Sequence, residues 1–435
     1  MGLTWYQDSL RQTFKSDFKP ENGDGFDVVI VGGGLAGLTL LHFLAEAGIE
    51  SLLIDSDEIG MGASGRNGGF CSPGWSQGYE ELLKSYNLKV VRELDHISSQ
   101  GLAWMKEKCT EGNFNSVEYK EGIVSCFLTG NAASAEKVIN KNNKIFETDH
   151  KFLPKDELEK IIVCNRYLFG VKLDEGFHFH PLNFMKSLAK ECVKKGGKVS
   201  EKCTLVNYRK HQAKYNLKID LGGEIQNISC EKIVFATGGY AGREIGNLRR
   251  YWLPILTFMG VTEPLEKKLF DIFIQNYGIS DNRRAGNYYR IVDRNRISWG
   301  RGISALGDIS VSTIKQQVAK DINFFFPELG LLNIDYAWSG KMAYARHLMP
   351  YVGLVNTGKK NGIYALTGFG GHGMNTAPGC AMVLAEHLIS GSKSYTAFDV
   401  FERSWNGGLL GPYAAEAKYI YLKMWDYLEQ IYNRG

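Results

Sequence analysis

The feature that most constrains this chain is a run of glycines between an apolar strand and a helix. Residues 27–31 (DVVIV) form a β-branched run, the motif GGGLAG follows at 32–37, and the next segment, LTLLHFLAEAG, has helical spacing. A second apolar run, SLLID, ends at Asp55, which lies 55 − 37 = 18 positions after the last glycine of the motif. This order and spacing predict a dinucleotide-binding βαβ unit.

Each part of the glycine motif has a physical role. Gly32 permits the tight turn, Gly34 lets a pyrophosphate approach the backbone, and Gly37 lets the helix pack on the strand. Leu35 and Ala36 lie at the start of the helix, whose free N–H groups bind phosphate, so we assign them to the cofactor site as well.

The end of the second strand limits the choice of cofactor. Asp55 is placed to accept hydrogen bonds from ribose hydroxyls, its charge disfavours a 2′-phosphate and therefore NADP, and Ser56 beside it is included in the site. The glycine motif does not separate FAD from NAD. The loop GMGASGRNGG at 60–69 suits a backbone wrapped around a flat ring system, whereas a flexible linker is the less favoured interpretation. We therefore expect FAD.

Composition defines the class of protein. A length of 435 residues predicts two or three domains at roughly 150 residues each, and 44% hydrophobic with 23% charged residues excludes wholesale disorder. The net charge of +4 is scattered, which gives no support for nucleic-acid binding. The eight cysteines form no C-x-x-C pair, no secretory signal opens the chain, and no apolar run of about 20 residues occurs, so we expect a cytoplasmic protein without an integral membrane segment.

Two histidines offer the spacing of a metal site. His178 and His180 alternate onto one strand face, but no third or fourth ligand is recognisable, and zinc sites need three or four protein ligands. We expect no metal. The pair is better interpreted as a junction between a strand and a helix that Pro181 opens.

Five motifs distributed along the chain carry a family resemblance. They are W-Y-x-x-S at 5–9, GASGRNGG at 62–69, ATGG at 236–239, YYR at 288–290 with RISWG at 296–300, and GGHG at 370–373. With these motifs the sequence resembles the D-amino-acid oxidase superfamily of FAD-dependent oxidoreductases, most closely its gamma-glutamylputrescine oxidase-like branch.

The resemblance implies an α/β fold: a discontinuous Rossmann-like FAD-binding domain and an α+β substrate domain with a mainly antiparallel sheet. The segments VTEPL, NYYRIV and RISWGRGIS have the β-branched and aromatic content of its strands. The implied division is an N-terminal extension 1–25, an FAD-binding domain 26–99, 172–241 and 341–412, a substrate domain 100–171 and 242–340, and a C-terminal helix 413–435.

The resemblance also implies further cofactor contacts. Those in the loop that would lie beside the isoalloxazine, or next to it, are Ala63, Ser64, Arg66, Asn67, Gly68 and Gly69. The others are Leu205 at the adenine; Ala236, Thr237 and Gly238 on the other side of the cofactor; and Gly370, Gly371, His372, Gly373 and Met374 in a turn before a helix. That turn would point its N–H groups at the flavin N1–C2=O edge.

Two departures from the family pattern bear on the chemistry. Sarcosine oxidases attach FAD to a cysteine near the segment that here reads Trp338-Ser339-Gly340, so we expect noncovalent FAD. They also hold the substrate carboxylate with a lysine at the position of Asn375, so the usual clamp for a small amino acid is missing. The absence shifts the expected substrate toward an amine without an adjacent carboxylate.

Other residues are candidates for the substrate site. An arginine is an alternative carboxylate anchor, and among Arg66, Arg290, Arg301 and Arg346 we favour Arg301, which alternation places on the same strand face as Trp299. An exposed strand-end arginine is the alternative interpretation. Tyr289 either lines the pocket or belongs to the core, and His372 is either an acid–base group or a positional residue near the flavin.

The predicted function is the FAD-dependent oxidation of an amine C–N bond. Hydride passes to the flavin, the imine hydrolyses to an aldehyde, and O2 reoxidises the flavin with release of H2O2. The alternatives are a dehydrogenase that uses a quinone or carrier acceptor, a flavin-binding protein without activity, and an NAD-dependent enzyme. The oligomeric state stays open.

The aromatic C-terminal helix also has two interpretations. It could lie on a membrane, or it could pack on the protein or on a partner subunit. The sequence favours packing, because the polar face is not strongly basic.

Overall fold

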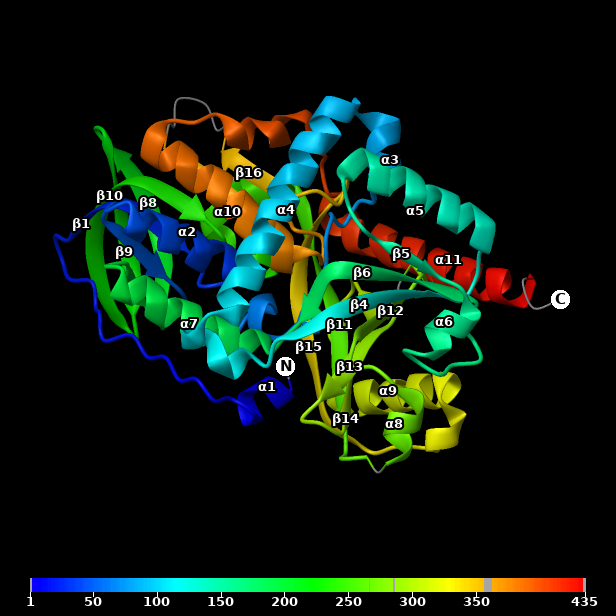
Figure 1. Ribbon diagram of the computed structural model, residues 1–435. Coiled ribbons are helices and arrows are strands. Elements are labelled where there is room, and N and C mark those ends of the chain that lie inside the picture. Colours follow the sequence, from blue (N-terminus) through cyan, green and yellow to red (C-terminus); the bar gives the residue numbers. More distant parts are fainter. Residues whose placement is uncertain (1, 266, 285, 356–361, 433–435) are drawn as a thin grey trace.

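Two β-sheets with helices packed around them make up the protein. The computed structural model describes residues 2–265, 267–284, 286–355 and 362–432. Figure 1 shows the sheets side by side, with α2, α4, α7 and α10 around the first and α8 and α9 against the second. The predicted fold class, a Rossmann-like unit beside a mainly antiparallel sheet, is confirmed.

The first sheet has eight strands and contains the βαβ unit. Its order is β16-β17-β10-β1-β2-β7, and the five strands from β17 to β7 are parallel, while β16, β9 and β8 pair antiparallel. The bounds are β1 Gly25–Val31, β2 Ser51–Ile54, β7 Lys198–Ser200, β8 Cys203–His211, β9 Lys214–Leu221, β10 Glu224–Phe235, β16 Tyr351–Leu354 and β17 Ile363–Thr367.

Both faces of this sheet are covered. Val28 and Ile30 face a helical layer of α2 (Leu35–Glu46), α4 (Leu88–Thr110), α7 (Pro181–Lys194) and α10 (Gly373–Ser390). Val29 and Val31 face the opposite layer, which includes the β8–β9 hairpin. Burial on both faces explains why β1 reads as a continuous apolar run.

The second sheet has nine strands and is antiparallel except where β12 pairs with β4. Its order is β15-β11-β14-β13-β12-β4-β6-β3, and β5 pairs with β6. The bounds are β3 Phe70–Cys71, β4 Lys120–Phe127, β5 Lys151–Leu153, β6 Phe169–His178, β11 Trp252–Thr262, β12 Gly278–Asp281, β13 Tyr288–Val292, β14 Arg296–Ser304 and β15 Ile334–Ala345.

Helices also pack on the second sheet. α6 (Lys155–Glu159), α8 (Lys268–Ile272) and α9 (Val311–Phe325) cover one face and share a hydrophobic core with it. The C-terminal helix α11 (Gly411–Tyr432) lies on the other side, where it closes a large cavity. The remaining helices are α1 (Trp5–Asp8), α3 (Tyr79–Ser85) and α5 (Ala132–Phe146).

Most of the predicted elements are found, with small shifts. NYYRIV and RISWGRGIS form β13 and β14, and α7 begins at Pro181 with His180 as its N-cap. VTEPL was predicted as a strand, but β11 ends at Thr262. The reason is that Pro264 has no N–H to donate.

Several of the predicted domain boundaries fall inside continuous elements, whereas 241/242 lies between elements. The 99/100 boundary lies within α4, 171/172 lies within β6, and 340/341 lies within β15. α4 packs along its length against the helical layer of the first sheet, and β6 and β15 are paired along theirs in the second. Boundaries that follow these contacts come after α4, after β6 and after β15.

α4 and α10 approach each other closely because two glycines lie at their contact. A Cβ at Gly101 would overlap the carbonyl oxygen of Asn375, and a Cβ at Gly379 would overlap that of Ile97. α10 carries the turn predicted to face the flavin, so this crossing sets the depth of that turn.

We therefore expect Gly101→Ala to push the two helices apart. Overpacking of this kind costs about 1–3 kcal/mol of unfolding free energy, which thermal denaturation followed by circular dichroism will report as a fall of several degrees in Tm. Gly78→Ala is the matched control, since Gly78 has φ −64° and open space around its Cβ position. Equal Tm values for the two variants would contradict this account of the crossing.

Candidate active site

A cavity of about 2100 Å³ lies between the two sheets. Ligand pockets for small molecules hold about 300–1,000 Å³, so this one has room for a dinucleotide and a second molecule. The predicted cofactor residues that line it are Gly32, Gly34, Leu35, Ala36, Asp55, Ser56, Ala63, Ser64, Arg66, Asn67, Gly68, Leu205, Ala236, Thr237, Gly238, Gly370, Gly371, His372, Gly373 and Met374.

Two predicted cofactor residues lie behind the cavity wall. A Cβ at Gly37 would overlap the carbonyl oxygen of Gly32, and a Cβ at Gly69, where φ is +76°, would overlap that of Phe179. Packing therefore requires glycine at both positions, and at Gly69 the positive φ requires it as well, so these residues shape the wall without lining the cavity.

The glycine turn is held in an open form that a dinucleotide fits. Gly32 has φ +117°, its N–H donates to Ile54 O at 2.9 Å, and the N-cap position Gly34 has no side chain to satisfy the first turn of α2. Gly33 N donates to Asp55 Oδ2 at 2.5 Å. Leu35 N donates to Ser64 Oγ at 2.9 Å, and the turn leaves space for a pyrophosphate beside the other N–H groups at the start of α2.

Asp55, the residue predicted to contact the adenosine ribose, lines the cavity directly after β2. Its carboxylate accepts hydrogen bonds from the N–H groups of Gly33 and Asp57, at 2.5 and 2.8 Å. Burial raises the pKa of Asp55, and these two hydrogen bonds oppose the rise. The oxygens keep acceptor capacity toward the cavity, which suits ribose hydroxyls.

The loop at 60–69 is fixed by its own side chains. Asn67 Nδ2 donates to the carbonyl oxygens of Ala63 and Ser64, and its Oδ1 accepts from Gly69 N at 2.8 Å. Arg66 Nη1 donates to Ser339 O on β15 at 2.9 Å. The loop is therefore a rigid wall that joins both sheets, in contrast to a flexible linker.

A buried arginine supports this loop from behind. Arg290 on β13 is 2% exposed, its Nε donates to Gly68 O and its Nη2 to Phe179 O, both at 2.8 Å, and its Nη1 lies 3.5 Å from His178 Nδ1. Within the described part of the chain no carboxylate pairs with it. A buried cation without a counterion therefore lies directly behind the predicted flavin wall.

His178 stays neutral beside this cation. Burial, and after it the charge of Arg290, lowers the pKa of His178 to about 3. Its Nε2 is 3.0 Å from Asn276 O, and the nitrogens of His180 contact Ser9 Oγ and Asn183 N. Because both rings are committed to these contacts, they serve the junction before α7, and the described residues contain no group of His, Cys, Asp and Glu side chains placed to hold a metal.

The α10 turn presents backbone to the cavity, while its polar side chains are held elsewhere. His372 Nε2 lies 3.2 Å from the carbonyl oxygens of both Ser72 and Pro73, so it carries the proton, and burial lowers the pKa of the ring. Asn375 is 1% exposed, and its amide donates to Gly74 O and Ser98 Oγ. Asn375 thus positions α10 on its neighbours, and its amide group is not free to act as a substrate clamp.

Three predicted substrate residues lie on the wrong side of the sheet. Trp299 and Arg301 do share a face, but that face packs under α9: Trp299 stacks on Tyr289 with ring centroids 4.2 Å apart, and Arg301 is paired with Asp321 of α9. None of the three lines the cavity. The prediction of Arg301 as the substrate anchor is corrected, because alternation fixes which residues share a face and does not say which face meets the ligand.

The opposite face supplies tyrosines that the sequence did not single out. Tyr288, Tyr344 and Tyr419 line the cavity from β13, β15 and α11. Tyr288 lies 3.3 Å from Thr257 Oγ1 and burial raises its pKa to about 12, while burial also raises the pKa of Tyr344 and of Tyr419. Because successive strand residues point to opposite faces, the pair YY at 288–289 puts one tyrosine on each face of the sheet, and this was the sequence signal for a tyrosine in the cavity. No sequence pattern indicated that Tyr419 lines it.

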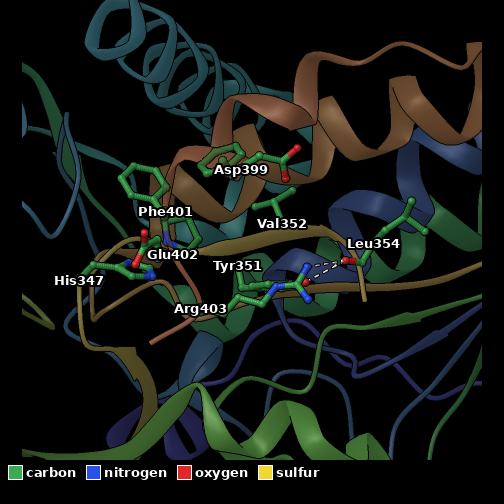
Figure 2. A pocket seen from close by; sticks show the side chains of 10 residues that line it. His347, Tyr351, Val352, Leu354, Asp399, Phe401, Glu402 and Arg403 are labelled. Atoms are coloured by element: carbon green, nitrogen blue, oxygen red, sulfur yellow. Dashed lines mark hydrogen bonds between the residues drawn. The ribbon is translucent and has the colours of Figure 1, made fainter. Parts of the chain in front are cut away.

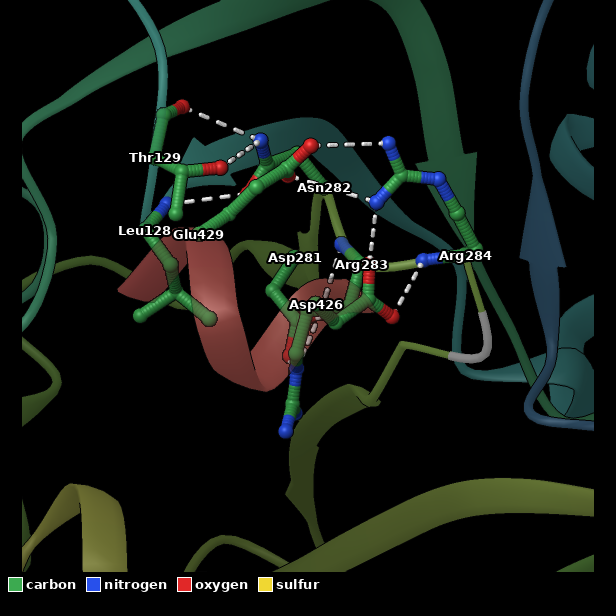
Figure 3. Close-up of polar contacts among 8 residues, drawn as sticks. All are labelled: Leu128, Thr129, Asp281, Asn282, Arg283, Arg284, Asp426 and Glu429. Carbon is green, nitrogen blue, oxygen red and sulfur yellow. Dashed lines mark hydrogen bonds and ion pairs between the residues drawn. The ribbon is translucent and has the colours of Figure 1, made fainter. Parts of the chain in front are cut away.

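Charged side chains line the cavity from several elements. The carboxylates in its lining as described are Asp55 and Asp57, both directly after β2, whereas Arg346 and Lys418 line it from the segment after β15 and from α11. Lys341 of β15 also lines it, with its Nζ 5.5 Å from the centroid of the Tyr240 ring. Arg284 also lines it but is paired with Asp426 and Glu429 of α11 at 2.6 and 3.1 Å, as Figure 3 shows. For Arg346 and Lys418 the described residues provide no carboxylate partner.

A second, smaller cavity of about 190 Å³ lies beside β16 (Figure 2). Arg403 donates to Leu354 O at 3.1 Å and lies over the Tyr351 ring, and His347 stacks on Phe401. None of the motif residues lines it. We therefore locate the chemistry in the larger cavity.

The βαβ turn, the glycine-rich wall and the α10 turn on one cavity define a flavin-dependent oxidoreductase. The family model described as FAD dependent oxidoreductase (DAO) matches residues 27–387. The chain belongs to this family, and FAD is its cofactor.

Relatives and solved structures agree with the family. Gamma-glutamylputrescine oxidoreductase from Escherichia coli (strain K12) is 26% identical over 374 residues, 86% of this chain and 85% of that protein. A probable oxidoreductase OrdL from Haemophilus influenzae is 25% identical over 406 residues, 91% of this chain and 90% of that protein. The structure of an L-amino acid deaminase from Proteus vulgaris has the same fold, with a TM-score of 0.70 and 15% identity over 89% of this chain and 100% of that one.

We expect Arg290 to raise the reduction potential of the bound flavin, because a buried cation stabilises the added negative charge. Arg290→Met should lower the two-electron potential by some tens of millivolts, measured by spectroscopic titration of the FAD-loaded protein. Arg290→Lys keeps the charge and should stay close to the parent potential. Equal potentials in the Met variant and the parent would show that the guanidinium acts only as a support.

Buried histidines should make the protein acid-sensitive. Burial lowers the pKa of His42 to about 4 and of His178 and His180 to about 3 from 6.5, so the folded state holds them neutral while the unfolded state takes up protons below pH 6.5. The contribution of these neutral histidines to the free energy of unfolding is complete above pH 6.5. It is lost as the pH falls toward 3–4, by about 1.4 kcal/mol per pH unit for each such histidine. Urea unfolding at several pH values should show a shallower slope for His178→Gln and the parent slope for His96→Gln, since His96 is exposed.

Proposed function

We propose that this protein oxidises the C–N bond of an amine that carries a carboxylate remote from the reacting carbon, as gamma-glutamylputrescine does, with noncovalent FAD and with O2 as acceptor. The observation that carries the proposal is the charge of the cavity lining: its described carboxylates, Asp55 and Asp57, directly follow β2, whereas Arg346 and Lys418, for which the described residues provide no carboxylate partner, line it beside Tyr344 and Tyr419 in the sequence. Flavin supplies the two-electron oxidation of the amine to an imine, which water then hydrolyses to an aldehyde.

The charge pattern favours a neutral amine as the reacting species. Close to Tyr344 and Tyr419 the described lining offers Arg346 and Lys418 and no carboxylate, so a positively charged ammonium group is disfavoured there. Desolvation against Tyr288, Tyr344 and Tyr419 acts in the same direction, and both effects lower the pKa of the amine. A neutral amine keeps the lone pair that oxidation of its C–N bond requires, and no side-chain base is needed.

The free cations support a substrate carboxylate at the rim. Arg346 and Lys418 are exposed and line the cavity, and the described residues leave both without a carboxylate partner. A carboxylate held there would stand apart from the reacting carbon. This separation distinguishes the proposed substrate from glycine or sarcosine, whose carboxylate is adjacent to the reacting carbon, and the engagement of Asn375 with Gly74 and Ser98 agrees with it.

The substrate class is tested by anaerobic bleaching of the flavin band. Gamma-glutamylputrescine, putrescine, sarcosine, glycine and D-alanine are added in turn to the FAD-loaded protein. We expect bleaching by gamma-glutamylputrescine at concentrations about tenfold lower than by putrescine, and none by the amino acids, because one ion pair of about 1.4 kcal/mol separates the two amines. Bleaching by the amino acids alone would refute the proposed substrate class.

Lys418→Gln tests whether the cation at the rim binds the substrate carboxylate. We expect it to raise KM for gamma-glutamylputrescine by about tenfold with kcat retained, and to leave putrescine oxidation unchanged. Lys423→Gln is the control, because Lys423 lies on the same helix and does not line the cavity.

The peroxide released per turnover in air tests O2 as the electron acceptor. Turnover that needs a dye or a quinone would assign a different acceptor.

A further inference from the structure

The C-terminal helix α11 is amphipathic with its polar side turned toward the protein. All three of its acidic residues contact the main body: Asp426 and Glu429 pair with Arg284, and Glu416 accepts a hydrogen bond from Ala305 N at 2.8 Å. Figure 3 shows the first two of these side chains directed from the helix toward Arg284. The helix is thus attached by ionic contacts along its inner side.

Its outer side is apolar and exposed. Tyr413, Ile420, Met424, Tyr427 and Ile431 are exposed to between 54% and 65%. Tyr421, Trp425 and Leu428 widen this face, and each is at least 46% exposed. The segment that leads into the helix continues the same character, with Leu409 at 93% and Leu410 at 74%. An apolar surface of this extent marks an interaction site.

The width of the face indicates what covers it. At 100° per residue, the exposed apolar positions from Tyr427 to Trp425 span about 160° of the helix. A two-stranded helical pair uses a narrower seam flanked by charged residues, whereas here Tyr421 and Leu428 occupy one flank. The face is therefore too wide and too apolar at its edge for a helix pair with a second copy of the chain.

The charges on the outer side are complementary to anionic headgroups. Lys418 and Lys423 are exposed and lie at the two edges of the apolar face, Lys418 at the edge that borders the cavity. Glu416 lies at the same edge as Lys423, but its carboxylate is directed to the protein, where it accepts a hydrogen bond from Ala305 N. Lysines at this place extend toward headgroups while the apolar side chains enter the acyl boundary. Among the described residues no helix is long and apolar enough to cross a bilayer, so such a helix lies in the plane of the surface.

We propose that α11 docks the protein on an anionic lipid bilayer through the face formed by Tyr413, Ile420, Met424, Tyr427 and Ile431. Tyr419 and Leu422, on the other side of the helix, line the active-site cavity. Docking therefore places the rim of the cavity next to the membrane surface. The proposal does not depend on the substrate, since binding is measured without turnover.

Flotation of the full-length, FAD-loaded protein with vesicles tests the proposal. We expect flotation with phosphatidylglycerol–phosphatidylcholine vesicles, much less with phosphatidylcholine alone, and weakening by salt. Ile420→Asp together with Met424→Asp should reduce vesicle affinity by at least about tenfold, because both apolar side chains would be removed from the boundary. Leu331→Asp is the matched control, an exposed apolar residue outside α11.

Other results would overturn the assignment. Parent protein that stays unbound at low salt, or an α11 double variant that floats like the parent, excludes a lipid surface as the partner of this face. Light scattering that shows a dimer, converted to a monomer by the same double variant, would assign the face to a second copy of the chain. Lys423→Gln should weaken flotation about two- to threefold and reduce its salt dependence; an unchanged salt dependence would contradict the role given to the flanking lysines.

Discussion

The guanidinium of Arg290 is the interaction on which the rest of the site depends. It extends from β13 of the second sheet to Gly68 in the flavin wall, to Phe179 at the start of the α7 segment, and to the hydroxyl of Tyr6 in α1. These four segments are far apart in the sequence. A lysine cannot satisfy acceptors in so many directions, because only arginine presents its donors in a fixed planar fork.

This arrangement also has an electrostatic consequence. Burying a cation without a carboxylate partner costs free energy, and carbonyl oxygens offset only part of that cost. The remaining positive potential acts on whatever lies against the loop. With FAD bound at this wall, as proposed, the cation would stabilise the negative charge that a flavin gains on reduction. Burial, and after it the charge of Arg290, lowers the pKa of His178 and keeps the ring neutral.

The βαβ unit and the cofactor wall could be predicted from the sequence because they depend on local backbone constraints. Gly32 and Gly37 leave signatures that no other residue can replace. The substrate end could not be predicted in the same way. Tyr289, Trp299 and Arg301 obey the strand period that the sequence shows, but their face packs under α9, whose docking is set by long-range core contacts.

The C-terminal helix shows the same limit more sharply. Its composition was compatible with packing on the protein and with binding to a membrane, and the structure shows contacts with the protein on one side of the helix and an exposed apolar face on the other. The ionic pairs of Asp426 and Glu429 with Arg284 hold the inner side of the helix on the protein, where Asp426 is buried. The apolar face is consequently left exposed, an arrangement that costs solubility unless another phase covers it. Because Tyr419 on the inner side closes the cavity, a helix attached in this way connects the surface on which the protein rests to the access of substrate.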